Sequence, residues 1–255
     1  MLITFLGTGT SQGVPVIGCK CEVCCSGDPR DKRLRSSVMV ETTELRLIID
    51  AGPDFRYQML RENISQIDAL LITHGHKDHI GGMDDLRPFN YLMRKAVEVY
   101  AAENVHLDIR RDFFYAFEEE RYPGIPEMNL HVIDNLPFNI GPTQVIPVEV
   151  DHHHLKVLGF RIENFAYITD ASHIAAAEME KLKGLEVLVI NALRMEPHVS
   201  HFSLPEALEV ISLLKPRQAY LTHISHRLGL HEVVERQLPP GIFLAYDRLR
   251  VECCL

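Results

Sequence analysis

Apolar residues along the chain are concentrated in short runs that are bounded by Gly, Pro, Asn, Asp or Ser. Such bounded runs, rich in Val, Ile, Leu and Phe, are typical of buried strands. Residues 38–41 and 45–49 are two such runs around a short polar turn, which predicts a hairpin. The same pattern predicts strands at residues 2–6, 69–73, 97–101, 145–150, 159–163, 165–169, 187–191 and 219–222.

Helical segments alternate with these strands. Ser203 and Glu206 form a capping box at the start of a helix over residues 205–214, and Gly184 marks the end of a helix over residues 174–183. Further helices are predicted at residues 53–62, 105–117 and 231–238. Residues 118–142 contain four prolines and are predicted to form a loop-rich insertion.

Hairpins and intervening helices occur in both halves of the chain. This order predicts an α/β (α+β) fold, in which two mixed sheets pack face to face with helices outside, as a four-layer αββα sandwich. No stretch resembles an interdomain linker, and no repeat of fixed period occurs. We therefore expect a single domain over residues 1–255.

Composition narrows the classes of function. The chain has 255 residues and a net charge of −9, from 26 Lys and Arg against 35 Asp and Glu. Polymeric nucleic acid is usually held by a basic stripe, so we expect no nucleic-acid polymer as a partner. No apolar run approaches the ~18 residues of a membrane span, and the N-terminus lacks the basic region of a signal peptide. We expect no membrane partner and a reduced, cytoplasmic location.

Potential metal ligands are concentrated directly after the predicted strand at residues 69–73. His74, His76, Asp78 and His79 follow it within six residues. Placing these side chains against an apolar core without a partner is costly, and one tetrahedral ion cannot use all four comfortably. The segment therefore predicts ligands for two ions about 3.5–4 Å apart, a separation at which a bridging water is activated as hydroxide.

Three other predicted strands also end in His or Asp. Asp151 and the triplet at residues 152–154 follow one strand, Asp170 follows a second, and His223 follows a third. A carboxylate can bridge two ions, whereas His usually binds one. These strand ends are therefore expected to complete the ligand set.

The run Thr73-His74-Gly75-His76-Lys77-Asp78-His79-Ile80-Gly81 resembles the signature of metallo-β-lactamase superfamily hydrolases, and the resemblance covers essentially the whole chain. It implies the metallo-β-lactamase fold and two divalent ions, Zn or Mn. Asp50 is similar to an acidic residue that orients the ligands, and His153 is the alternative to His152. The ligands implied are His74, His76 and His152 for the first ion, Asp78, His79 and His223 for the second, and Asp170 between them.

Within the superfamily, the sequence most resembles the PhnP-type cyclic phosphate phosphodiesterases. The supporting residues are Cys19, Cys21, Cys24 and His226. Three thiolates and an imidazole form a closed tetrahedral set for one structural zinc. The resemblance places this zinc in a Cys-rich segment at residues 19–30, close to His223, with Cys25 as the alternative to Cys24. It also implies a homodimer.

The ligand set and the resemblance together predict a metal-dependent hydrolase that cleaves a small cyclic phosphate or a nucleotide phosphodiester. Asp78, within the ligand set, and His201 are the residues expected to be catalytic. His201 lies in a loop before the helix at residues 205–214 and matches an active-site His of the PhnP type. With a pKa near its ordinary value, it would protonate the leaving alkoxide, and His198 is the weaker alternative.

Three other functions stay open on the sequence. A tRNA 3′-processing endonuclease has a similar core but needs a basic surface that grips RNA, which the acidic balance disfavours. Other hydrolases of the superfamily act on thioesters or lactones. A metal-binding redox sensor built on the Cys-rich segment is the alternative without catalysis. The Gly-rich residues 7–13 are either a phosphate-binding loop or a plain turn.

Overall fold

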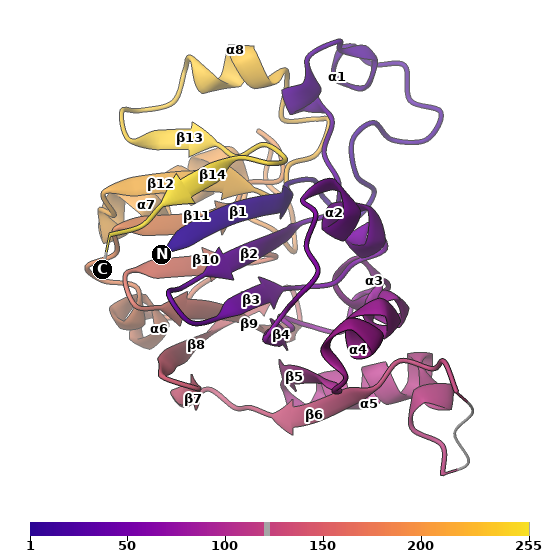
Figure 1. The fold of residues 1–255 in the computed structure, drawn as a ribbon. Coiled ribbons are helices and arrows are strands. Elements are labelled where there is room, and N and C mark those ends of the chain that lie inside the picture. Colours follow the sequence, from indigo (N-terminus) through magenta and orange to yellow (C-terminus); the bar gives the residue numbers. More distant parts are fainter. Residues whose placement is uncertain (120–122, 255) are drawn as a thin grey trace.

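The computed structural model describes residues 1–119 and 123–254, and it shows two seven-stranded sheets packed face to face (Figure 1). Residues 120–122 of the predicted insertion lie outside the described residues. In order across it, the first sheet contains β14 (Arg250–Glu252), β1 (Leu2–Gly7), β2 (Ser37–Glu41), β3 (Arg46–Ile49), β4 (Ala69–Leu71), β5 (Val97–Ala101) and β6 (Met128–Val132).

The second sheet mirrors the first, with hairpins and parallel strands in one layer. Its order is β13 (Ile242–Leu244), β12 (Gln218–Thr222), β11 (Val187–Asn191), β10 (Phe165–Ile168), β9 (Leu155–Ile162), β8 (Thr143–His152) and β7 (Phe138–Ile140).

Helices cover the outer faces of both sheets. The first sheet carries α2 (Phe55–Arg61), α3 (Lys77–Ile80), α4 (Arg87–Met93), α5 (Glu103–Asp112) and the 3₁₀ turns η2 (Met83–Leu86) and η3 (Phe114–Ala116). The second carries α6 (Ala176–Lys181), α7 (Leu204–Leu214) and α8 (His231–Glu235). A segment with α1 (Glu22–Cys25) and η1 (Pro29–Asp31) lies near α8 (Figure 1).

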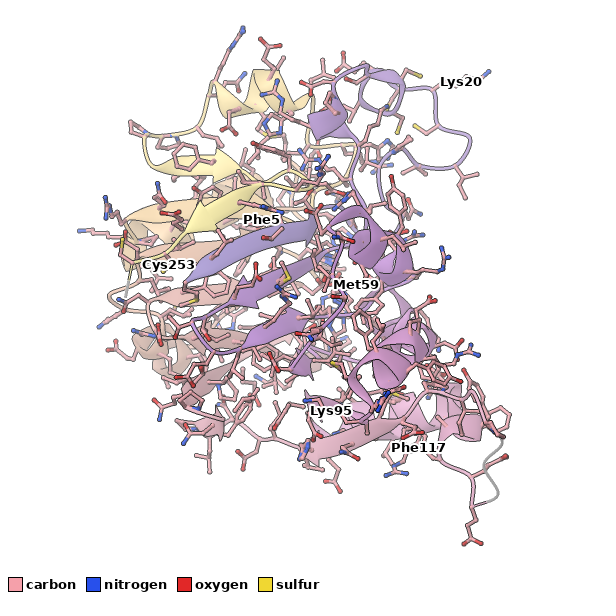
Figure 2. All side chains as sticks on the ribbon, in the orientation of Figure 1. Phe5, Lys20, Met59, Lys95, Phe117 and Cys253 are labelled. Atoms are coloured by element: carbon pink, nitrogen blue, oxygen red, sulfur yellow. The ribbon has the colours of Figure 1, made fainter. Side chains whose placement is uncertain are left out.

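Both faces of the central strands are apolar, because each sheet packs against the other sheet on one face and against helices on the other. In β10, Phe165 and Tyr167 lie between the sheets, whereas Ala166 and Ile168 pack in one cluster with α7. Phe5 of β1, labelled in Figure 2, is another buried residue of the layer between the sheets. Burial on both faces explains the continuous apolar runs in the sequence. The predicted αββα fold is confirmed.

Several details differ from the sequence prediction, and the short elements α1, α3, β13 and β14 were not predicted. The range predicted as a loop-rich insertion contains β6 and β7, which are half-exposed edge strands and therefore give no continuous apolar run. The helix predicted at residues 105–117 is α5 followed by η3, because the backbone leaves the helical region at Phe113 (φ −119°, ψ 38°). Helix α4 begins with a proline in its first turn and was not predicted.

The topology brings several strand ends to one edge of the sandwich. Strands β3 to β6 are parallel to one another, and so are β10 to β13. Strand β8 runs antiparallel to β9, which runs antiparallel to β10, so β8 ends at the same edge as β10. The residues that follow β3, β4, β8, β10 and β12 therefore converge, and these include the predicted ligands.

Candidate metal centre

The chain turns sharply where the ligand-bearing strands end. Asp50, Asp170 and His223 have φ values of 66°, 58° and 55°, in the left-handed region that few residues other than Gly adopt. Each stands directly after a buried strand or one residue beyond it. Such backbone conformations are retained only where the surrounding structure fixes them, and here they turn polar side chains toward a common point.

The first group of potential ligands consists of three imidazoles. The ligand atoms of His74, His76 and His152 all lie within 4.8 Å of one another, and His74 Nε2 is 3.0 Å from His76 Nδ1. Burial lowers the pKa of His74 well below its ordinary value, and burial also lowers the pKa of His76. Both rings are therefore neutral near pH 7, which is the form that binds metal. His153 is exposed and lies outside this group.

The second group combines two carboxylates with two imidazoles. One ligand atom from each of Asp78, His79, Asp170 and His223 lies within the same 4.8 Å limit. His79, Asp170 and His223 are buried, whereas Asp78 is partly exposed at the start of α3. The structure thus brings together all seven residues expected to hold the two catalytic ions.

Asp170 lies between the two groups. Its Oδ1 is 3.0 Å from His223 Nδ1 and 3.5 Å from His79 Nε2. Its Oδ2 is 3.2 Å from His201 Nε2 and 3.8 Å from His74 Nε2. One carboxylate oxygen therefore faces each group, which is the arrangement that the sequence predicts for a bridging ligand. His152, Asp170 and His201 also have ligand atoms within 4.8 Å of one another, as a third combination.

The electrostatics of the centre favour positive charge. Burial disfavours the charged form of His79, but the carboxylates of Asp50, Asp170 and Asp78 outweigh it and hold its pKa well above the ordinary value. Burial likewise opposes ionisation of Asp170, yet His223 and His79 hold the pKa of this carboxyl well below its usual range. Three buried or half-buried carboxylates at one point create the negative potential that a divalent cation satisfies.

The residues fit the divalent ions that the resemblance implies. Within the described residues, His79 Nε2 is one of the few buried side-chain nitrogens or oxygens without a hydrogen-bond partner, and it points toward Asp78 and Asp170. An unpartnered buried nitrogen is costly unless something coordinates it. Imidazole and carboxylate ligands suit Zn and Mn, and the arrangement divides them into two adjacent sets.

Outer partners fix the orientation of the imidazoles. Asp50 accepts hydrogen bonds from the Thr73 amide at 2.9 Å and from His79 Nδ1 at 2.7 Å. His152 Nδ1 donates to the Ser200 carbonyl at 2.8 Å. The resemblance predicted that Asp50 orients the ligands. The role of the Ser200 carbonyl was not predicted, because a backbone acceptor cannot be recognised from residue types. Such partners set which ring nitrogen faces the metal.

His201 lies against Asp170 rather than apart from the ligands. Its pKa is lowered to about 4 by burial, against the hydrogen bond with Asp170 that raises it. The ring is therefore neutral near pH 7 in the protein alone, and the expectation of an ordinary pKa is wrong. His198 is a neighbour, with its Nδ1 at 3.3 Å from His201 Nδ1.

The Cys-rich segment forms a second cluster. The Sγ atoms of Cys19 and Cys21 lie 3.4 and 3.3 Å from His226 Nδ1. Ligand atoms of Cys19, Cys21, Cys24 and His226 all lie within 4.8 Å of one another, whereas Cys25 is exposed and outside the set. The Cys24 amide and the His226 ring lower the pKa of Cys21 to about 6, which favours the thiolate that binds metal. Lys20 points outward from this segment (Figure 2).

The arginines beside the Gly-rich loop form hydrogen bonds and ion pairs with other residues of the protein. Arg33 is buried and donates to Thr8 Oγ1 at 3.0 Å and to the Ala245 carbonyl at 2.5 Å. Arg35 pairs with Asp54 at 3.0 Å. These partners leave Arg33 no path to a substrate phosphate.

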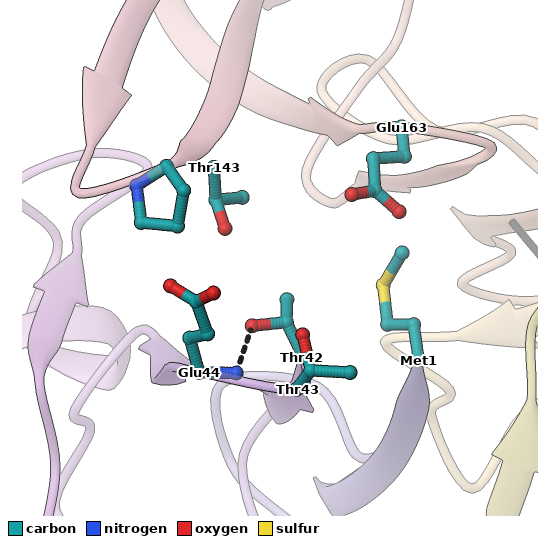
Figure 3. Close-up of a pocket in the computed structure, with 7 residues that line it drawn as sticks. Met1, Thr42, Thr43, Glu44, Thr143 and Glu163 are labelled. Carbon is teal, nitrogen blue, oxygen red and sulfur yellow. Dashed lines mark hydrogen bonds between the residues drawn. The ribbon is translucent and has the colours of Figure 1, made fainter.

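Neither of two cavities is lined by a residue of the centre. One of about 450 Å³ has Thr73, the residue before His74, and His154 in its wall beside Asn104 and Lys156. A smaller cavity of about 140 Å³, drawn in Figure 3, lies at the opposite ends of the strands and contains no residue of the cluster. Within residues 1–119 and 123–254, no helix is long and apolar enough to cross a membrane.

Comparisons with known proteins identify the family. The model of the Beta-lactamase superfamily domain matches residues 45–224. An octanoyltransferase of Porphyromonas gingivalis (strain ATCC BAA-308 / W83) is 41% identical over 98% of this chain, but this chain spans only 51% of its length.

Comparisons with solved structures support the same family and fold. One similar crystal structure is described as a new diphosphatase from the PhnP family. Its sequence is 43% identical, its TM-score is 0.92, and the match covers 100% of this chain and 99% of that chain. Zn²⁺-bound PqqB from Methylobacterium extorquens shares the fold, with a TM-score of 0.80, 18% identity and coverage of 99% of this chain and 100% of that chain.

The chain belongs to the β-lactamase superfamily and has the metallo-β-lactamase fold. It is related to a PhnP-family diphosphatase, so the resemblance inferred from the sequence is confirmed.

Proposed function

We propose that the protein is a metal-dependent phosphodiesterase that hydrolyses a small cyclic phosphate or a nucleotide phosphodiester. The observation that carries the proposal is the position of Asp170, whose two oxygens face two separate sets of imidazoles. Two divalent cations held by these sets would activate a water near neutral pH and neutralise the charge of the phosphoryl oxygens. Asp50 and the Ser200 carbonyl orient two of the imidazoles, those of His79 and His152.

The relation to a PhnP-family diphosphatase supports phosphate chemistry and favours a second substrate class. A diphosphate linkage presents the same anionic phosphorus centre as a diester, with a phosphate instead of an alkoxide as the leaving group.

Two other activities have weaker support. The similarity to the octanoyltransferase does not support a transferase activity, because about half of that protein has no counterpart in this chain. Processing of tRNA is disfavoured by the net charge of −9. We propose a small-molecule substrate, with no membrane and no nucleic-acid polymer as partner.

A substrate panel tests the proposal. The full chain, loaded with Zn²⁺ or Mn²⁺, is assayed on bis-p-nitrophenyl phosphate, 2′,3′-cyclic nucleotides, a dinucleoside diphosphate, a thioester, a lactone and a precursor tRNA. We expect turnover of the phosphate esters or of the diphosphate, and loss of that turnover after chelation. Turnover of the thioester or lactone without any phosphate substrate would overturn the proposal.

We further propose that His201 is the proton donor to the leaving group. Its Nε2 lies 3.2 Å from Asp170, within the cluster rather than at its rim. A negative phosphoryl oxygen beside the ring would raise its pKa and favour the protonated form. The proton then passes from Nε2 to the departing alkoxide.

Replacement of His201 by Gln should therefore depend on the leaving group. With a 2′,3′-cyclic nucleotide, whose alkoxide needs a proton, we expect kcat to fall by about 10²–10⁴-fold. With bis-p-nitrophenyl phosphate, whose p-nitrophenolate leaves as a stable anion, we expect a much smaller loss. Steady-state kinetics on both substrates decide the matter, and equal losses on the two would argue against the proton-donor role.

The Cys-rich cluster is proposed to hold one structural zinc. A site that binds metal at ~1,000 times its Kd stabilises the folded state by about 4 kcal/mol, so Cys21→Ser should remove one zinc per chain and lower the free energy of unfolding by a few kcal/mol. Metal analysis and thermal unfolding measure both effects. The matched control is Cys25→Ser, because Cys25 is exposed and outside the cluster. Loss of zinc in the control but not in Cys21→Ser would contradict the assignment.

A further inference from the structure

The Gly-rich residues 7–13 form a loop that is fixed on both sides. On one side the Gly9 amide donates to the Leu34 carbonyl at 2.7 Å, and a Cβ on Gly9 would lie only 2.9 Å from the Arg33 carbonyl oxygen. On the other side the Thr10 amide donates to the Ile224 carbonyl at 3.1 Å. Because these amides are already hydrogen-bonded, they are not available to cradle a phosphate.

This loop delivers the Thr10 side chain to the metal centre. Thr10 Oγ1 lies 3.2 Å from His223 Nε2, and both residues are buried. The other ring nitrogen, His223 Nδ1, lies 3.0 Å from Asp170 Oδ1. Thr169 Oγ1 is farther from Nδ1, at 3.4 Å, and it donates to Asp170 at 2.6 Å.

Stacking alone does not settle the orientation of the His223 ring. The ring is nearly parallel to that of His79, at 6.0 Å, and to that of His201, at 4.8 Å and 23°. These neighbours fix the plane of the ring, but the ring would pack between them equally well after a half-turn about the Cβ–Cγ bond. A half-turn would exchange ring nitrogens for ring carbons on both edges. A hydroxyl on one edge removes this ambiguity, because it forms a hydrogen bond with a ring nitrogen and not with a ring carbon.

We infer that Thr10 is a positioning residue for His223. The inference rests on the proposed two-cation centre and concerns how the chain prepares one of its ligands. With a cation bound, Nε2 would donate its proton to Thr10 Oγ1, which leaves the Nδ1 lone pair on the Asp170 side free to bind that cation. Unlike a carboxylate partner, the neutral hydroxyl orients the ring without adding charge to a centre that already contains three carboxylates.

Two substitutions at position 10 separate the hydroxyl from the packing. Thr10→Val keeps the shape and removes the hydroxyl, whereas Thr10→Ser keeps the hydroxyl and removes the methyl group. Thr8→Val is the matched control, because Thr8 lies in the same loop but its hydroxyl contacts Asp247 and Arg33 rather than the centre. Each purified chain is titrated with Co²⁺ and with Zn²⁺ against a competing chelator, and Co²⁺ absorption spectra are recorded.

We expect Thr10→Val to bind the more weakly held cation of the centre about 10- to 100-fold less tightly and to change the Co²⁺ spectrum. Thr10→Ser and Thr8→Val should bind it as the wild type does. Wild-type affinity in Thr10→Val, or an equal loss in Thr10→Ser or Thr8→Val, overturns the role of Thr10 alone. A wild-type chain that takes up only one cation at the strand ends overturns the proposed centre as well.

Discussion

Replacing Asp170 with Asn should reduce kcat on bis-p-nitrophenyl phosphate by about 10³-fold or more, since the two cations of such a centre contribute several kcal/mol to transition-state stabilisation. The substitution keeps the side-chain volume but leaves one carbonyl oxygen where two charged oxygens faced both ligand groups. It also removes the negative charge of a carboxylate that lies 3.5 Å from His79 and 3.0 Å from His223. We therefore expect the variant to fold and to bind fewer than two cations at the centre, as measured by metal analysis.

The control for this prediction is Asp151→Asn. Asp151 also stands at the end of a strand and next to a His, and its loss changes the net charge by the same amount. However, Asp151 pairs with Lys156 at 2.6 Å and with His173 at 2.8 Å, and it belongs to no ligand group. Activity close to that of the wild type is expected. If Asp170→Asn kept full activity and two cations, the proposed centre would be refuted.

The grouping of residues in the candidate metal centre was largely predictable because its signal is local. Each of the seven expected ligands follows an apolar run, and the end of a buried strand is visible in the sequence without knowledge of the partners. Parallel strands then bring these ends to one edge. The fold class followed from the order of hairpins and intervening helices in both halves of the chain.

Choices between adjacent residues could not be made from the sequence. His152 is the last residue of β8 and its ring lies among the other ligands, whereas His153 has a φ of 55° in the hairpin turn and is exposed. Cys24 is buried and Cys25 exposed for a similar reason, because one turn of α1 directs them to different sides. Both members of each pair are the same residue type, so only the direction in which the backbone points each side chain distinguishes them.

Contacts between segments that are distant in the chain could not be predicted from the sequence either. Thr10 and His223 are 213 positions apart, and nothing in a Gly-rich turn indicates which of its hydroxyls meets a ligand. The low pKa of His201 depends on burial by segments that are remote in the chain. Glycines that are needed for space form a third case, since the sequence shows the glycine but not the atom that approaches it.

Gly52 is such a position, and it lies where the segment after β3 crosses the start of α3. The Ala51 amide donates to the His79 carbonyl at 2.7 Å, so the two segments are held in contact. A Cβ on Gly52 would overlap the backbone carbonyl of Asp78, and a Cβ on Gly82 would overlap the carbonyl of Gly52. Neither glycine has a positive φ, so space rather than backbone conformation requires them.

Gly52→Ala should therefore displace Asp78 and His79 together. Overpacking of this kind costs about 1–3 kcal/mol of stability, and a shift of ~1 Å at a reactive centre costs about 10²-fold in rate. We expect a lower unfolding temperature, weaker binding of the cation held by Asp78, and a kcat reduced by about two orders of magnitude. Gly82→Ala should show the same pattern. Gly27→Ala is the control, because a Cβ there would meet nothing within 4 Å. If Gly52→Ala kept wild-type stability and kcat, the close crossing of the two segments would not be what positions these ligands.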